Sequence, residues 1–215
     1  MLQILTQASD WINQTFYGFD AAIFEWTHNL EQLCPWLYNL ARFISFFGDK
    51  GIFIIALSLL LLVFRKTRKL GILACICVAF GSILNNYVLK EIIARPRPYD
   101  EVELFKSFWL ASGEHLWGGE SILMDSWSFP SGHTTLFSTF GVAMFIGLNK
   151  KYSWAFLFMP FIMAWSRVAL FVHYPSDVLF GILIGVISGV VAYYGRILVL
   201  KIKFVENLTT GDKLF

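Results

Sequence analysis

The stretch from Leu70 to Leu89 most constrains the fold, because it contains no charged side chain over its whole length. An α-helix needs about 20 consecutive apolar residues to cross a lipid bilayer, and this stretch is long enough. The composition agrees, since 57% of the residues are hydrophobic and only 15% are charged, against about 25% charged in soluble domains. We therefore expect an all-α integral membrane protein.

Four further apolar segments, at 51–64, 132–148, 152–172 and 178–200, are candidates for membrane-spanning helices. The first of them is short for a span unless it includes the turn before it. The segment 152–172 contains Pro160, which is expected to kink it. With 70–89, these segments predict a bundle of five spans, or of six if the N-terminal region supplies another.

The N-terminal region, residues 1–50, is amphipathic and aromatic but interrupted. Asp20 is placed to cap a short helix, a second helical piece covers 36–47, and Asp49 is placed to cap the next. We expect these pieces to lie in the membrane interface, with a sixth span as the alternative. The whole chain, 1–215, is read as one domain, with a catalytic helical core at 51–203.

The distribution of basic residues predicts the orientation in the membrane. The short loops 65–69 and 149–151 are basic and lack acidic residues, and such loops usually face the cytoplasm. Loops 90–129 and 173–177 would then lie on the extracytoplasmic side, and acidic residues outnumber basic ones in the first of them. We expect a multi-pass protein of the cell (plasma or inner) membrane with a cytoplasmic C-terminus.

This topology brings charged residues from three segments to one face of the membrane. The turn 130–133 opens directly into an apolar helix, so its backbone N–H groups and the helix dipole favour a bound anion. His173 and Asp177 are four residues apart at a helix start, a spacing that lets a carboxylate orient an imidazole. The residues assigned to this anion site are Lys90, Arg97, Ser131, Gly132, His133, Arg167, His173 and Asp177.

Several of these residues also have plainer interpretations. Lys90 could be an interface anchor at the end of a span. The Arg-Pro-Arg-Pro sequence at 95–98 could simply break a helix. Arg167 is harder to explain in this way, because a charge at membrane depth is costly unless it faces a polar cavity.

The spacing of these residues resembles the three signatures of the type 2 phosphatidic acid phosphatase (PAP2) superfamily. No motif position is substituted, and the order is the same. The matching residues are Lys90-x6-Arg97-Pro98, Pro130-Ser131-Gly132-His133 and Ser166-Arg167-x5-His173-x3-Asp177.

The resemblance implies a metal-independent lipid phosphatase without a cofactor. By this likeness His173 is the nucleophile that forms a phosphohistidine, Asp177 orients it, and His133 is the general acid. Cationic side chains would stabilise the phosphoryl oxygens in place of a metal ion. The phosphate-binding set implied by the family is Lys90, Arg97, Ser131, Gly132 and Arg167.

A membrane lipid phosphate is the expected substrate, and undecaprenyl diphosphate or a phosphatidylglycerophosphate-type lipid is the best guess for a bacterial enzyme. The rival functions are a lipid phosphotransferase with the same site, a vanadium haloperoxidase-like oxidoreductase, and a catalytically silent membrane scaffold. Apart from the lipid and the bilayer no partner is predicted, and the net charge of +2 gives no argument for nucleic acid.

Two further features leave alternatives open. The aromatic insertion at 99–129, expected to be helical or looped and extracytoplasmic, could form a lid over the site or an ordinary aromatic belt. The glycine row of Gly181, Gly185 and Gly189 marks a close-packing helix face. It could pack within the chain or against a second copy.

Overall fold

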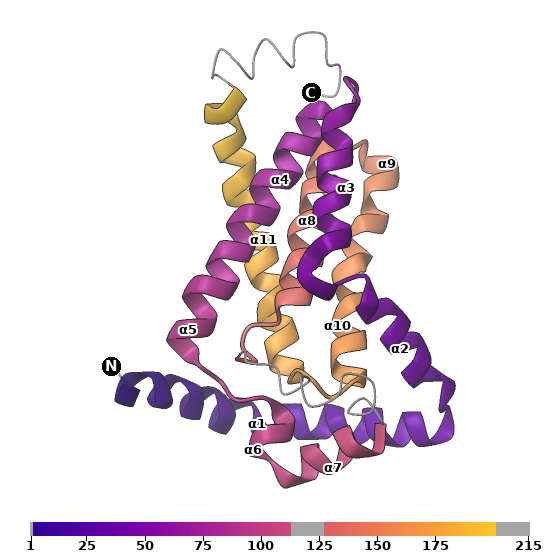
Figure 1. Ribbon diagram of the computed structural model, residues 1–215, viewed down its shortest axis with the longest axis vertical. Coiled ribbons are helices and arrows are strands. Elements are labelled where there is room, and N and C mark those ends of the chain that lie inside the picture. The colour runs from indigo at the N-terminus through magenta and orange to yellow at the C-terminus, as the bar shows by residue number, and fades with distance from the viewer. Residues whose placement is uncertain (1, 113–126, 201–215) are drawn as a thin grey trace.

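The protein, described here by a computed structural model at residues 2–112 and 127–200, is helical in every regular element of those two stretches. A bundle of long helices stands on α1 (Leu2–Leu33), which runs across the lower end of the bundle (Figure 1). From the end of α1, α2 (Trp36–Phe46) rises obliquely to the bundle (Figure 1). The expected all-α architecture is confirmed for the described residues.

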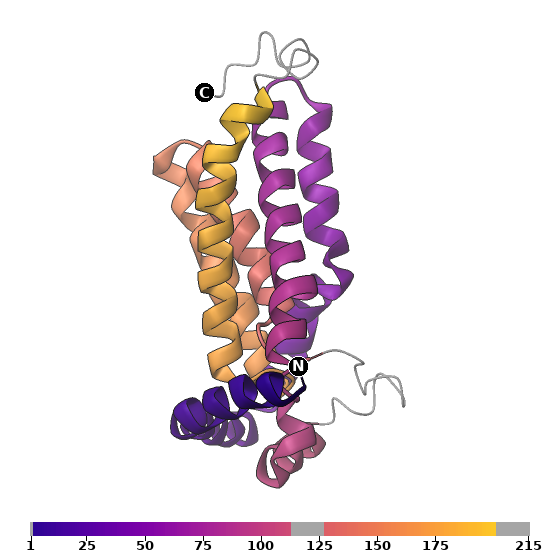
Figure 2. The ribbon, with the colours of Figure 1, turned by 90° about the vertical axis from the view of Figure 1, so that its left-hand side faces the viewer.

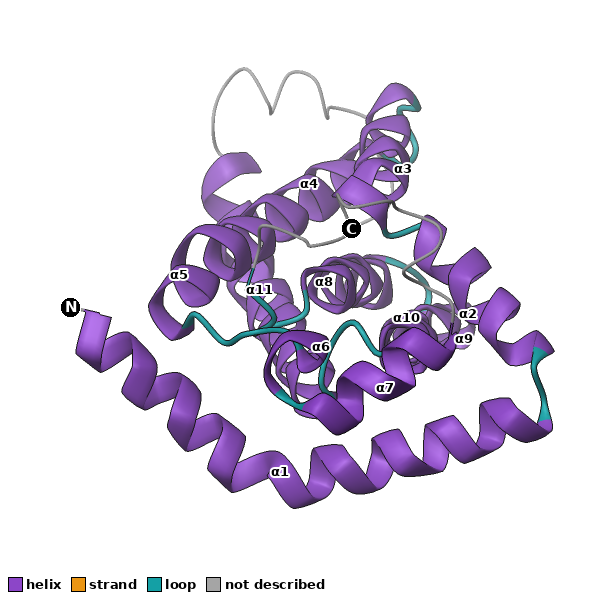
Figure 3. Ribbon diagram, turned by 60° about the horizontal axis from the view of Figure 1, so that its bottom comes forward, coloured by secondary structure: helices purple, strands orange, loops and turns teal. Residues whose placement is uncertain are grey.

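Helix α8 (Gly132–Gly147) lies at the centre of the bundle (Figure 3). Of its 16 residues 11 are buried and none is exposed, as expected for a helix enclosed by others. The helices around it are α3 (Ile52–Val63), α4 (Arg68–Ile83), α10 (Met159–Ala169) and α11 (Pro175–Leu200).

Shorter elements connect the bundle helices. Helix α4 continues through a π-helical turn, η2 (Leu84–Leu89), into α5 (Lys90–Ile93). A π-helical turn often marks a functional site. The remaining short elements are η1 (Asp49–Gly51), α6 (Pro98–Glu101), α7 (Glu103–Ser112), α9 (Lys150–Ser153) and η5 (Trp154–Phe158).

Three helical stretches are long and apolar enough to cross a membrane, namely Trp36–Val63, Arg68–Glu101 and Pro175–Gly195. The chain is thus an integral membrane protein by its helices, as predicted. Helix α8 has 16 residues and so rises about 24 Å, somewhat less than the hydrocarbon core of a bilayer. Five or six spans therefore stay a prediction. The predicted break in 152–172 is present, because η5 precedes Pro160 at the start of α10.

The N-terminal predictions need two corrections. Helix α1 is continuous through Asp20, so this residue does not cap a separate helix; its carboxylate is buried in the middle of α1. Asp49 likewise caps nothing with its side chain, because α3 begins after Gly51 in a left-handed conformation. Helix α1 lies across the lower end of the bundle, which is compatible with an interfacial helix. Its side chains Trp11 and Trp26 are largely exposed.

The described part of the 99–129 insertion packs against α1. Phe105, Phe108 and Trp109 are buried in one apolar cluster with Phe24 of α1. Figure 2 shows α1 and α7 below the same end of the bundle. An exposed aromatic belt therefore does not describe these three residues. Residues 113–126, with Trp117, lie outside the described part of the chain.

The glycine row on α11 packs inside one chain. A Cβ atom at Gly181 would lie 2.9 Å from the carbonyl oxygen of Ser131, and one at Gly185 would lie 2.2 Å from Cβ of Ser138. The row thus lets α11 approach α8 at backbone distance. Of the two interpretations, packing within the chain is the one that the structure supports.

We expect Gly185→Leu to destabilise the protein, because the new side chain must occupy space already filled by α8. Overpacking of this kind costs about 1–3 kcal/mol, which corresponds to a loss of roughly 5 °C in apparent melting temperature. Gly195→Leu on the same helix is the matched control, since nothing lies within 4 Å of a Cβ there. Thermal unfolding in detergent measures both, and equal melting temperatures would contradict close packing at Gly185.

Candidate active site

A cavity of about 390 Å³ opens at the lower end of the bundle, where α5, α8 and η1 come together. Basic and imidazole side chains contribute much of its polar lining. Among the lining residues are Lys50, Asn86, Lys90, Arg97, Gly132, His133 and His173. A concave site with several convergent cationic groups fits a phosphorylated ligand.

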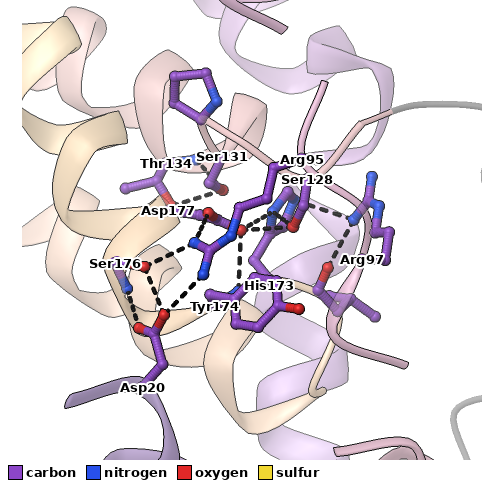
Figure 4. A network of polar contacts seen from close by, with 12 residues as sticks. Asp20, Arg95, Arg97, Ser128, Ser131, Thr134, His173, Tyr174, Ser176 and Asp177 are labelled. Carbon is purple, nitrogen blue, oxygen red and sulfur yellow. Dashed lines mark hydrogen bonds and ion pairs between the residues drawn. The ribbon is translucent and has the colours of Figure 1, made fainter. Parts of the chain in front are cut away.

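His173 occupies the turn between α10 and α11 and is only 2% exposed. Its Nε2 atom lies 3.2 Å from Nη1 of Arg97. Its Nδ1 atom lies 3.4 Å from Oγ of Ser128 and 3.5 Å from Oδ2 of Asp177 (Figure 4). The two ring nitrogens therefore have different surroundings: Nε2 is beside a cation, and Nδ1 is beside a carboxylate and a hydroxyl.

The pKa of the His173 imidazole is held well below its usual value. Burial is the main cause, because it disfavours the charged ring, and the nearby cations Arg97, Arg167 and Lys90 add to it by repulsion. The ring is consequently neutral at pH 7, and one nitrogen keeps a free lone pair. This is the protonation state that a nucleophile or a base requires.

Asp177 lies on the first turn of α11, and several hydrogen-bond donors hold its carboxylate. Nη1 of Arg95 donates to its Oδ1 at 2.7 Å. The Ser128 hydroxyl donates to its Oδ2 at 2.5 Å, and the backbone N–H of Tyr174 donates to the same oxygen at 3.0 Å. The carboxylate is 0% exposed. Its orientation toward His173 is thus fixed by the surrounding hydrogen bonds.

The turn before α8 places two of its residues at the cavity and one behind it. Gly132 and His133 line the cavity. A Cβ at Gly132 would lie 3.2 Å from Oδ1 of Asn86, so a side chain here would crowd the cavity wall. The Ser131 hydroxyl caps α8, and the backbone N–H of Ser131 donates to the carbonyl oxygen of Asp177 at 3.1 Å. Ser131 itself is not a lining residue.

His133 faces the cavity from α8 and is supported from the other side by η1. Its Nε2 lies 3.3 Å from Oδ1 of Asp49. A Cβ at Gly48 would come within 2.2 Å of the His133 ring, so the turn before η1 packs directly on the imidazole. Asp49 can therefore orient the His133 ring.

Five of the eight predicted site residues line the cavity, and three lie behind its wall. The lining residues are Lys90, Arg97, Gly132, His133 and His173, while Ser131, Arg167 and Asp177 are set back. Arg167 is buried and donates a hydrogen bond to Oγ of Ser45 on α2. The structure brings these segments together at one cavity, and only five of the predicted residues reach it directly.

Sequence reasoning missed several polar partners of the predicted residues. Asp49 contacts His133, Ser128 contacts His173 and Asp177, and Arg95 contacts Asp177. Ser128 stands just before the recognised turn, so its position next to a motif was the available signal. The Arg-Pro-Arg-Pro sequence points to a helix break and gives no sign of a partner for Arg95, and Asp49 lies 84 residues from its partner in sequence.

Within residues 2–112 and 127–200, no group of three or more His, Cys, Asp or Glu side chains is arranged to hold a metal ion. The polar groups that line the cavity are mainly cations, imidazoles and amides. These groups suit an anion rather than a divalent cation.

Comparison with known proteins identifies the family. The model of the PAP2 superfamily matches residues 68–198, which include every residue of the predicted site. The chain belongs to the PAP2 superfamily. Its predicted family and enzyme class, a PAP2 lipid phosphatase, are both confirmed.

Two curated relatives of this PAP2 protein align with it over about three quarters of each chain. It is 29% identical over 173 residues to the undecaprenyl-diphosphatase of Sulfolobus acidocaldarius, covering 78% of this chain and 74% of the relative. It is 42% identical over 164 residues to the bacitracin transport permease protein BcrC of Bacillus licheniformis, covering 76% and 72%.

Solved structures share the fold of this PAP2 chain. A PAP2-type phosphatidylglycerolphosphate phosphatase from Bacillus subtilis aligns with a TM-score of 0.64 at 21% identity, over 94% of this chain and 96% of that one. LpxE from Aquifex aeolicus aligns with a TM-score of 0.60 at 22% identity, over 81% and 94%. At these identities the likeness establishes the fold alone.

Proposed function

We propose that the protein hydrolyses the terminal phosphate of a membrane lipid phosphate or diphosphate through a phosphohistidine at His173. The observation that carries this proposal is the position of His173, whose neutral ring lines a cavity beside Arg97 and Lys90. A nucleophile next to fixed cations is the arrangement that phosphoryl transfer requires.

In the first step, the lone pair on Nε2 of His173 attacks the phosphorus. The bond between phosphorus and the leaving oxygen breaks, and His133, protonated at that point, gives its proton to this oxygen. The product is a phosphohistidine whose ring carries a positive charge. Asp177 and the Ser128 hydroxyl, both near Nδ1, stabilise that charge and hold the Nδ1–H tautomer.

In the second step, water attacks the phosphohistidine and inorganic phosphate leaves. His133, now neutral, accepts a proton from the water, and Asp49 holds the imidazole in position through both steps. The bond from Nε2 to phosphorus breaks, and His173 returns to its neutral form. The enzyme is therefore unchanged after one turnover.

The phosphoryl oxygens gain charge during both steps, and the cationic wall of the cavity stabilises it. Lys90 and Arg97 line the cavity directly. Arg167 does not line the cavity, and in this proposal its charge acts on the phosphoryl oxygens from behind the wall. The N–H group of Gly132 at the start of α8 adds a donor with the helix dipole behind it. In this proposal Ser131 supports the turn rather than binding phosphate.

A lipid substrate is favoured by where the cavity lies. It opens at one end of the bundle, and the basic loops at 65–69 and 149–151 are at the other end (Figure 1). By the positive-inside rule the cavity would face the extracytoplasmic headgroup region. The relative from Sulfolobus acidocaldarius is named an undecaprenyl-diphosphatase, and we propose undecaprenyl diphosphate as the preferred substrate.

Phosphate release by the purified protein from a panel of lipid phosphates tests this proposal. The panel contains undecaprenyl diphosphate, phosphatidylglycerophosphate and phosphatidate in detergent, with EDTA present throughout. We expect release from at least one lipid at a rate that EDTA does not reduce, because the cations Lys90 and Arg97 replace a metal ion. A strict need for a divalent cation would contradict the mechanism. Phosphate transfer to a lipid acceptor without release would indicate a phosphotransferase instead.

A further inference from the structure

A buried charged network lies behind Asp177 and joins it to the interfacial helix α1. Arg95, at 1% exposure, stands at its centre and does not line the cavity that contains His173. Asp20 of α1, at 0% exposure, is its second carboxylate. The network consists of Asn13, Asp20, Arg95, Ser176 and Asp177, all joined by hydrogen bonds (Figure 4 labels all but Asn13).

The guanidinium of Arg95 uses all three of its nitrogens. Nη1 donates to Oδ1 of Asp177 at 2.7 Å, Nη2 donates to Oδ2 of Asp20 at 3.0 Å, and Nε donates to Oδ1 of Asn13 at 2.7 Å. Its flat face lies 3.6 Å from the centroid of the Tyr174 ring. A planar fork of donors stacked on an aromatic ring leaves little freedom for rotation.

This geometry divides the two oxygens of Asp177 between two tasks. Oδ1 is taken by Arg95, which prevents the carboxylate from turning. Oδ2 remains with Ser128, the Tyr174 N–H and the Nδ1 side of His173. Without Arg95 the carboxylate could rotate, and the imidazole would lose its fixed orientation.

Asp20 secures the same unit from α1. Its Oδ1 accepts from the backbone N–H of Ser176 at 2.7 Å, and its Oδ2 accepts from the Ser176 hydroxyl at 2.7 Å. Ser176 directly precedes Asp177 on the first turn of α11. Helix α1 is thereby attached to the exact backbone segment that carries the catalytic carboxylate.

We propose that Arg95 is a positioning residue for Asp177 and that Asp20 is its anchor on α1, so that the interfacial helix is part of the catalytic apparatus. This inference rests on the proposed function, because it assigns to Asp177 the role of orienting His173. Neither Arg95 nor Asp20 lines the cavity that contains His173, so we expect neither to touch the substrate. Their loss should slow the chemical step and leave substrate binding intact.

Steady-state kinetics of Arg95→Met, Arg95→Lys and Asp20→Asn test this inference on a lipid that the wild-type protein hydrolyses. We expect Arg95→Met to lower kcat about 100-fold with an unchanged KM, since a misplaced catalytic group costs roughly this much. Arg95→Lys should lower kcat less than Arg95→Met does, because lysine keeps the positive charge but lacks the planar fork of donors. Asp20→Asn should cost on the order of 10-fold in kcat. Lys106→Met, which removes a cation half-exposed on α7, is the matched control with unchanged kcat and KM.

The double variant tests whether the two residues act as one unit. If they do, Asp20→Asn should add nothing to the loss in Arg95→Met, because effects within one network are not additive. If the fall in kcat of the double variant equals the product of the two single falls, Asp20 is not the anchor of Arg95.

The kinetic split distinguishes positioning from substrate binding and from folding. A raised KM with unchanged kcat in Arg95→Met would overturn the inference, since Arg95 would then bind substrate. If Arg95→Met does not give a monodisperse protein, the kcat of Arg95→Lys is the test instead. An unchanged kcat in Arg95→Lys would overturn the inference. A wild-type protein inactive on every lipid would refute the proposed function itself. An active wild type with kcat unaltered in these variants would refute only the role of Arg95.

Discussion

Replacement of His173 with alanine is expected to abolish phosphate release, with a fall in kcat of at least about 10⁴-fold, because it removes the atom that attacks phosphorus. His173 contributes little to the bundle's exterior, being 2% exposed in the turn between α10 and α11. The variant should therefore insert into the membrane and elute from a sizing column as the wild type does. His28→Gln is the matched control, because His28 lies on α1 against Phe108, away from the cavity.

The covalent intermediate provides a second measurement for the same prediction. A labelled substrate, quenched rapidly in alkali, should leave the label on the wild-type protein as a base-stable, acid-labile adduct. The His173→Ala protein should carry none. Substantial turnover by His173→Ala, or an adduct that survives its loss, would refute the assignment of the nucleophile.

The residues that reach the cavity were largely predictable from local sequence. His173 stands just before the start of α11, and the turn at 130–133 opens into an apolar helix, so short-range rules place both at helix starts. Their convergence follows from the topology, because alternate loops of a helical bundle lie at the same end. The five lining residues needed no long-range information beyond that.

The partners of those residues could not be predicted in the same way. Asp20 and Arg95 are 75 residues apart, and Asp49 and His133 are 84 apart. An acidic residue before a helical segment satisfies the capping rule equally well whether it caps or binds a distant cation. The capping rule therefore predicts caps at both Asp20 and Asp49, and only the packing of α1 and η1 on the bundle shows their actual partners.

The number of spans was less predictable than the number of helices. Apolar stretches identify helical segments well, and α3, α4, α8, α10 and α11 all lie within predicted ones or close to them. Whether a helix of 16 residues such as α8 crosses alone depends on the helices around it. Enclosure of α8 by its neighbours (Figure 3) is a tertiary property that hydropathy does not report.

Replacement of His133 with glutamine is expected to lower turnover of an alkyl phosphate ester such as phosphatidate by about 10³-fold, in the range for loss of a general acid. An alkoxide leaves poorly without a proton, so the first step should limit the rate. A substrate with a weakly basic leaving group, such as 4-nitrophenyl phosphate, does not need that proton. With it, His133→Gln should still form the phosphohistidine.

The two proposed tasks of His133 therefore separate in one stopped-flow experiment. With 4-nitrophenyl phosphate, His133→Gln should release a burst of one nitrophenolate per protein and then turn over slowly, because the base for the second step is missing. His173→Ala should show neither burst nor turnover, and His28→Gln should match the wild type. Equal losses on both substrates without a burst would mean that His133 acts on binding or folding instead. The turn before α8 would then supply only its backbone and dipole to the phosphate.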